Sequence, residues 1–247
     1  MIHLPPLPGY PESTGIDDAI RHAVRDLRVL EEAGVDGVLI ENEYDRPHRV
    51  TATPETIAAM TRITRAVVQE SENAIIGCEI LLNDPRASLA VASMSGASFI
   101  RTDYFVDAMT RPEYGEFEID PKGLIDYRTS IGAANILILT DIQVKYATMI
   151  NPRPLAQSAR LACAEGSDAL VVTGRESGDA PLIDDLREAM SGSDVPVLIG
   201  SGLDADNAAD LLAACDGAIV GTALMKDRAV DPDAVDLLMS RIGRAPG

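Results

Sequence analysis

Short runs of apolar residues recur along the chain, and longer stretches with a different apolar spacing separate them. Within the short runs almost every position is apolar, and β-branched residues are frequent. Unbroken runs of this kind are typical of parallel strands that are buried on both faces. They predict eight strands, at the stub 2–4 and at 37–41, 75–81, 98–103, 135–141, 169–174, 195–200 and 218–222.

The stretches between these runs carry apolar residues every three or four positions, which is the spacing of one helix face. The first stretch shows it at Ile16, Ile20, Val24, Leu27 and Leu30. Later helices are expected to open at capping residues, most of them followed by proline. These predicted openings are Thr53-Pro54, Asp84-Pro85, Asp120-Pro121, Asn151-Pro152, Asp204 and Asp231-Pro232.

This alternation predicts an α/β fold, a single (β/α)8 TIM barrel over residues 1–247 with a shortened first strand. Eight units favour closure over an open doubly wound sheet, and 247 residues is close to the roughly 250 of a typical barrel. The chain begins at Met1, immediately before the first strand, which leaves open whether the natural start lies upstream. The segment 105–117 is long for a loop, and we expect either a lid over the barrel mouth or a packed hairpin.

Charge narrows the range of partners. Asp and Glu total 39 against 21 Lys and Arg, which gives a formal net charge of −18. Nucleic acid and anionic lipid both attract cationic surfaces, so both are disfavoured as partners. An acidic surface that is poor in lysine is expected of a salt-adapted source such as a halophilic archaeon. No apolar run approaches the ~18 residues of a membrane span. The three cysteines form no CxxC motif, and we expect them to be buried free thiols. Both features lead us to expect a cytoplasmic protein.

Two glycine turns follow the last two predicted strands. The seventh strand runs into Gly200-Ser201-Gly202, and the eighth ends at Gly221-Thr222. Glycine lets the backbone approach a phosphate, and the loops after strands seven and eight are the usual phosphate site of TIM barrels. We expect these residues to bind one phosphate. The alternative is that the glycines only permit tight turns.

Carboxylates stand at or near the ends of four predicted strands, at Glu41, Glu79, Asp103 and Asp141. Side chains at these ends can converge on the barrel mouth. There they could divide general acid and base roles, or bind a divalent metal. The alternative, in so acidic a chain, is a set of helix caps and surface acids.

Cationic and titratable side chains stand near the same strand ends. Lys145 could hold a substrate anion, pair with Asp141 or form a Schiff base, or it could be a simple rim lysine. His3 could act as a base or ligand, and Arg101 and the loop 46–49 are candidates for anion contacts. The chain has no Ser-His-Asp signature, Walker loop or Rossmann fingerprint, so we propose no nicotinamide or flavin cofactor.

Four strings in order resemble the BtpA/SgcQ family over essentially the whole chain. They are HLPPLPG at 3–9, GVLIEN at 37–42, DIQVKYA at 141–147 and VTG at 172–174. The resemblance implies a barrel of the ribulose-phosphate-binding type. It also places Asn42, Thr173 and Gly174 in shared strings, and we expect these residues to contact substrate. The family takes its name from a role in photosystem I biogenesis, which is a context rather than a chemistry.

These features predict a barrel that binds a small phosphorylated metabolite, either a sugar phosphate or a nucleotide-derived compound. We expect an enzyme of sugar-phosphate metabolism with lyase, isomerase or hydrolase chemistry. The alternative is a non-catalytic assembly or stability factor, or a metabolite sensor, on the same fold. A homo-oligomer is compatible with either.

Overall fold

The computed structural model describes residues 1–144, 146–174 and 179–244. Its main sheet has eight parallel strands in the order β1-β2-β3-β4-β7-β9-β10-β11. Neighbours in the sheet follow one another along the chain with helices between them, which is the predicted barrel topology. The strands are β1 (Ile2–His3), β2 (Gly37–Glu41), β3 (Ile75–Glu79), β4 (Phe99–Thr102), β7 (Leu137–Asp141), β9 (Ala169–Val172), β10 (Val197–Ile199) and β11 (Gly217–Ala218).

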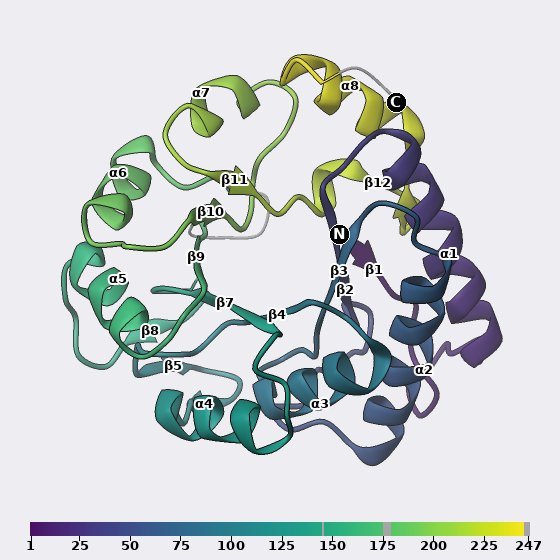
Figure 1. Ribbon diagram of the computed structural model, residues 1–247, viewed down its shortest axis with the longest axis horizontal. Helices are drawn as coiled ribbons and strands as arrows, with labels where there is room; N and C mark the ends of the chain where they lie inside the picture. Colours follow the sequence, from purple (N-terminus) through teal and green to yellow (C-terminus); the bar gives the residue numbers. More distant parts are fainter. Residues whose placement is uncertain (145, 175–178, 245–247) are drawn as a thin grey trace.

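The sheet curls around a ring, and the segment after its last strand leads back toward the start of the chain (Figure 1). The backbone nitrogen of Met1 donates to the Val220 carbonyl at 2.7 Å. The predicted eighth strand, 218–222, is correct in place, but β11 ends at Ala218, and a 3-10 turn, Thr222–Leu224, begins directly after Gly221. Among the described residues, the ring is therefore joined at this seam by a contact of the backbone rather than by a full strand ladder.

Helices surround the ring (Figure 1). The side chains of Thr53, Asp84 and Asp120 each accept a hydrogen bond from the amide three residues on, and Pro232 opens the last helix, as predicted. The helices are α1 (Ile16–Glu32), α2 (Pro54–Glu70), α3 (Pro85–Ser95), α4 (Pro121–Ser130), α5 (Leu155–Ala164), α6 (Ile183–Ser191), α7 (Ala208–Leu212) and α8 (Pro232–Arg241).

Two predicted helix openings were wrong. The helix expected at Asn151-Pro152 begins only at Leu155, after Pro154. The helix expected at Asp204 begins only at Ala208. Asp204 Oδ1 instead accepts the amides two and three residues on, at 2.9 and 3.0 Å. Such local side-chain turns compete with helix formation.

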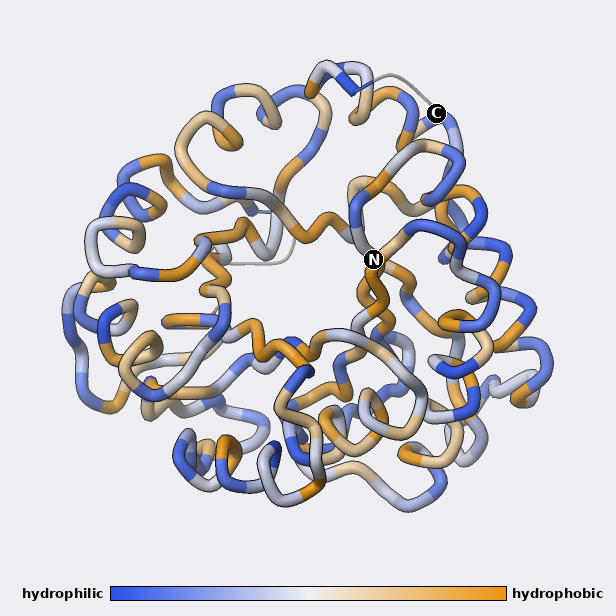
Figure 2. Tube along the Cα trace, in the orientation of Figure 1, coloured by the Kyte–Doolittle hydropathy of each residue, from blue (hydrophilic) through white to orange (hydrophobic). Residues whose placement is uncertain are grey.

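The strands supply two apolar layers. Ile40 and Ile138 are fully buried in the layer shared with the helices. Inside the ring, Leu139 and Val171 form a separate cluster against Phe99. Because side chains alternate across a strand, one sheet serves both layers, and Figure 2 shows apolar strand segments around the ring.

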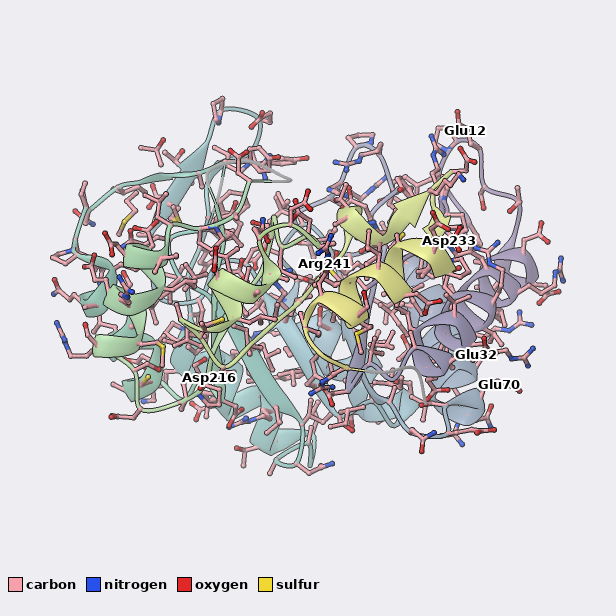
Figure 3. All side chains as sticks on the ribbon, turned by 90° about the horizontal axis from the view of Figure 1, so that it is seen from above. Glu12, Glu32, Glu70, Asp216, Asp233 and Arg241 are labelled. Carbon is pink, nitrogen blue, oxygen red and sulfur yellow. The ribbon has the colours of Figure 1, made fainter. Side chains whose placement is uncertain are left out.

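Charged residues labelled in Figure 3 lie on the outside of the molecule. Glu12 follows β1 and Asp216 precedes β11, and the figure shows them at opposite ends of the barrel. Within the described residues, no helix combines the length and apolar character needed to cross a bilayer. All three cysteines are free, but only Cys78 is buried, whereas Cys163 and Cys215 are half-buried.

The segment 105–117 is a packed hairpin. Its strands β5 (Met109–Arg111) and β6 (Gly115–Glu116) are antiparallel, and β8 (Thr148–Met149) joins β5 on the other edge. The Phe117 ring stacks on Tyr104 at 3.8 Å between centroids. The hairpin also contributes to the wall of the barrel mouth. A second short hairpin pairs β12 (Met225–Lys226) with β13 (Ala229–Val230).

Candidate functional site

A cavity of about 380 Å³ lies at the carboxyl ends of the strands. Residues from β1 to β4, both glycine turns and the hairpin line it, so segments far apart in sequence share one space. The site residues predicted from the sequence that line it are His3, Glu41, Glu79, Arg101, Asp103, Gly200, Ser201, Gly202, Gly221 and Thr222. The structure thus brings the two predicted phosphate turns and three of the four predicted acids together.

Four other predicted site residues do not line this cavity, namely Asp141, Asn42, Thr173 and Gly174. Asn42 is buried, accepts a hydrogen bond from the Leu81 amide at 2.8 Å and donates to Asp45 Oδ2 at 3.0 Å. It therefore ties together the loops after β2 and β3 beside the cavity rather than facing a ligand. Lys145, the predicted cation after β7, falls outside the described residues.

Arg101 on β4 is the centre of the charged wall. Its Nε and Nη2 donate to the two carboxylate oxygens of Asp141 at 2.8 and 2.9 Å. Its Nη1 lies 3.7 Å from Glu41 Oε1, and its Nε lies 3.9 Å from Glu79 Oε2. Burial opposes the charge, but the Asp141 and Glu79 carboxylates outweigh it and raise the pKa of Arg101 well above its ordinary value. Asp141 thus positions Arg101.

Glu41 and Glu79 are direct neighbours on β2 and β3, and they form the last residue pair of these two parallel strands. Burial, and then the nearby carboxylates of Glu41 and Asp103, raise the pKa of Glu79 well above its ordinary value, which favours its protonated form. Glu41 Oε1 is buried and has no hydrogen-bond partner among the described residues. A buried acceptor left without a donor is costly, so a donor on a ligand would satisfy it.

His3 lies beside Glu41 at the end of β1. Burial lowers the pKa of His3, which favours the neutral imidazole, and its Nε2 lies 4.0 Å from Glu41 Oε2. The His3 carbonyl is 3.1 Å from His22 Nε2, which is also 3.2 Å from Asp26 Oδ2. With the His22 proton on Nε2, the α1 pair of His22 and Asp26 anchors the end of β1 from outside the ring.

The glycine turns are tightly packed. A Cβ on Gly200 would lie 2.4 Å from Val171 Cγ1, and Gly202 has a φ of +71° with Ala180 N 2.1 Å from an added Cβ. The Ser201 hydroxyl accepts from Gly174 N and donates to the Asp179 carbonyl, both at 3.0 Å. The Ser201 side chain is thus occupied, and an anion would meet backbone amides here. Thr222 begins the 3-10 turn, whose first amides have no acceptor within the turn.

Among the residues of the cavity that were not predicted as site residues are the cation Arg111 and the tyrosines Tyr114 and Tyr146. All three line it. The Arg111 guanidinium carbon lies 5.3 Å from the Tyr114 ring centroid and 5.5 Å from that of Tyr146. Tyr114 reaches Arg111 within the β5–β6 hairpin, and Tyr146 reaches it where β8 pairs with β5, so no regular spacing along the chain predicts the three together.

The acids do not form a metal site in the described part of the chain. No three His, Cys, Asp or Glu side chains there are arranged as ligands of one ion. Glu41 and Glu79 face Arg101 instead, at 3.7 and 3.9 Å, so a guanidinium occupies the position where a cation would balance them.

Comparisons with known proteins agree with this architecture. Residues 1–244 match the BtpA family. An uncharacterized protein from Archaeoglobus fulgidus is 35% identical over 235 residues, covering 95% of this chain and 94% of that one. The photosystem I biogenesis protein BtpA from Synechocystis is 32% identical over 240 residues, covering 94% and 83%. Among solved structures, thiamine phosphate pyrophosphorylase from Pyrococcus furiosus superimposes with a TM-score of 0.59 at 17% identity, covering 89% of this chain and 88% of that chain. The chain belongs to the BtpA family.

Proposed function

We propose that the protein binds a small phosphorylated metabolite in this cavity and acts on it by proton transfer, as an isomerase or lyase. The observation that carries the proposal is the shared cavity, in which the turns after β10 and β11 face the same space as the carboxyl groups of Glu41 and Glu79. The turns would bind an anion through their backbone amides, and the carboxyl groups of Glu41 and Glu79 would contact the reacting part of the ligand.

The phosphate is assigned to the two glycine turns. In TIM barrels the loops after the seventh and eighth strands are the usual phosphate site, and β10 and β11 hold those places here. The solved structure compared above is that of a thiamine phosphate pyrophosphorylase, a protein named after a phosphorylated compound. That likeness concerns the fold, so the phosphate assignment depends on the turns themselves.

The carboxyl pair is suited to acid–base chemistry. Of two neighbouring carboxyl groups, one can give a proton while the other takes one. In the proposed step, Glu41 takes a proton from a carbon next to a carbonyl, and protonated Glu79 gives its proton to the carbonyl oxygen. In a substrate that carries a hydroxyl on that carbon, the product is an enediol. The ionised Glu79 then takes the proton of the other hydroxyl, and Glu41 gives its proton to the former carbonyl carbon, which yields the isomer and restores both carboxyl groups. Arg101 keeps both groups in place, and the neutral His3 ring lies beside Glu41.

Binding is tested by thermal unfolding with ribose 5-phosphate, using ribose as the uncharged comparison. We expect the phosphate ester to raise the melting temperature and ribose to leave it unchanged. Thr222→Asp places a negative charge at the exposed turn and should abolish the shift. Thr129→Asp is the matched control, because Thr129 is exposed near the end of α4, away from the cavity. An equal shift in both variants would contradict the phosphate site.

Catalysis is tested by exchange of substrate hydrogen with solvent deuterium across a panel of sugar phosphates, followed by NMR. We expect exchange with at least one compound, and loss of it in Glu41→Gln while binding survives. Glu72→Gln, at an exposed position, is the control. Binding without exchange for any compound would contradict the enzyme and would support the non-catalytic sensor or assembly factor.

The acidic surface leads to a second proposal, that the protein is adapted to high salt. Its support is the net charge of −18. Salt screens repulsion between exposed like charges. We therefore expect the melting temperature to rise from dilute buffer to molar KCl, and a fall would contradict salt adaptation.

A further inference from the structure

We propose that the metabolite carries a second anionic group, a carboxylate or another phosphate, and that Arg111 binds it on the part of the cavity wall formed by the β5–β6 hairpin. This inference rests on the proposed function, since it assigns another part of the same ligand. It narrows the ligand class from any phosphate ester to a compound with two anionic groups.

The guanidinium group of Arg111 is held in place by its backbone pairing and by two tyrosine rings. Arg111 ends β5 and pairs with Gly115 of β6, so the hairpin fixes its backbone. Its guanidinium carbon lies 5.3 Å from the Tyr114 ring centroid and 5.5 Å from the Tyr146 ring centroid. Cation–π contacts hold a guanidinium without using its N–H donors, which stay available for an acceptor.

Two buried donors here lack acceptors. Arg111 Nε and Tyr104 Oη are both buried, and neither atom meets the geometry of a hydrogen bond among the described residues. The Arg111 side chain is close enough to the Tyr104 hydroxyl to oppose the rise of its pKa, so the two donors are neighbours. Tyr104 is only 3% exposed. Burial raises the pKa of Tyr104 to about 12, so its hydroxyl keeps its proton. Buried donors without partners are rare and costly, and an anion is the group that accepts from both a guanidinium and a hydroxyl.

The other cationic side chains that line the cavity in the described part of the chain are paired, exposed or neutral. Arg101 is bonded through two nitrogens to buried Asp141. Arg46 pairs with Glu43, but its side chain is 62% exposed, so solvent already screens its charge. Burial lowers the pKa of His48 to about 4, so that ring is neutral near pH 7. The carboxylate that faces Arg111 Nε is Glu113 Oε2, at 3.7 Å on a side chain that is 62% exposed. A pair so exposed contributes little, so Arg111 retains charge to offer a ligand.

The base of this site is packed. Tyr104 stacks on Phe117 at 3.8 Å, and Met109 and Val144 are buried in the same cluster. The hairpin that carries Arg111 is therefore supported by a small apolar cluster. In this proposal the role of the hairpin is to hold Arg111 at the cavity wall.

The inference is tested by calorimetry with matched ligand pairs. The pairs are glucose 6-phosphate with 6-phosphogluconate, and fructose 6-phosphate with fructose 1,6-bisphosphate. They separate a carboxylate from a second phosphate as the extra group. Within at least one pair, we expect the compound with two anionic groups to bind about 10- to 100-fold more tightly, as fits one charge-assisted contact.

Three variants locate the contact. Arg111→Gln should reduce that ratio to about one and leave the affinity for the monophosphate unchanged. Tyr104→Phe should reduce the ratio without lowering the melting temperature, because its hydroxyl has no partner among the described residues. Arg86→Gln is the control, since Arg86 also lies over a tyrosine, 5.3 Å from the Tyr127 centroid, but is exposed and outside the cavity.

The outcomes separate the two proposals. Binding of the monophosphates with no gain from a second anionic group would overturn this inference and leave the phosphate site standing. A gain that survives Arg111→Gln would overturn the assignment to Arg111. Failure of every phosphate compound to bind would overturn both proposals.

Discussion

The two sides of the cavity are lined by different kinds of residue. The turns after β10 and β11 line the cavity mostly with glycine and with small or aliphatic residues, and one acid, Asp204, is among them, with no cationic residue of the described chain. The side formed by β2, β3 and β4 presents buried Glu41, Glu79 and Arg101. The first depends on close packing, because an added methyl group would clash, whereas the second depends on charge balance, because each charge needs a partner. A mutation at the turns is therefore expected to act through shape, and one at the charged wall through electrostatics.

The largest expected effect follows removal of the central charge. Arg101→Met leaves the Asp141 carboxylate buried without its two donors. We expect the free energy of unfolding, measured in denaturant, to fall by about 3–5 kcal/mol. Arg28→Met is the control, since Arg28 pairs with Glu70 on the exposed surface and should cost about 0–1 kcal/mol. Equal losses would show that the wall does not depend on charge balance.

A smaller effect is expected from shape at the turn. Gly200→Ala would place a Cβ 2.4 Å from Val171 Cγ1 and 3.0 Å from Arg101 Nη2. We expect a loss of about 1–3 kcal/mol in the free energy of unfolding, as for other overpacked sites. Gly217→Ala is the matched control, because its Cβ would meet only Leu198 Cδ2, at 3.2 Å. If the two variants proved equally stable, packing would not be what requires glycine at the turn.

The smallest effect is a change in pH dependence. Glu79 has its pKa raised above 4.5 in the folded state, so the folded protein holds a proton that the unfolded chain releases. Wild-type stability should therefore fall as the pH rises from 4.5 toward the folded pKa, by at most about 1.4 kcal/mol per pH unit.

Glu79→Gln cannot ionise and should lack this fall. The difference in unfolding free energy between variant and wild type should thus grow in favour of the variant across that window. Glu72→Gln, at an exposed position, should run parallel to the wild type. A Glu79→Gln curve that is also parallel would mean that Glu79 is ionised in the folded protein.

Much of the fold was predictable because its signals are local. Apolar runs located all eight strands of the main sheet, and capping residues located the starts of α2, α3 and α4. The errors also have local causes. Asp204 resembles a helix cap but forms a turn with the amides of Asp206 and Asn207. The last strand ends at Ala218, although the apolar run continues to Val220.

The site was predictable only where strand ends define it. Glu41, Glu79 and the glycine turns could be placed because barrel strands end on one face. The pairing of Asp141 with Arg101 depends on which side chains meet across β4 and β7. The contact of Arg111 with Tyr114 and Tyr146 depends on a hairpin whose strands are two or three residues long. Such contacts leave no periodic signal in the sequence.

The central claim is that one phosphate is held by both turns at once. The most direct measurement is a titration with ribose 5-phosphate, followed through the backbone amide signals by two-dimensional NMR. We expect the amides of Gly202 and Thr222 to shift together along one binding curve, while that of Thr129 stays in place. Saturable binding that moves other amides and leaves Gly202 and Thr222 unchanged would contradict the claim.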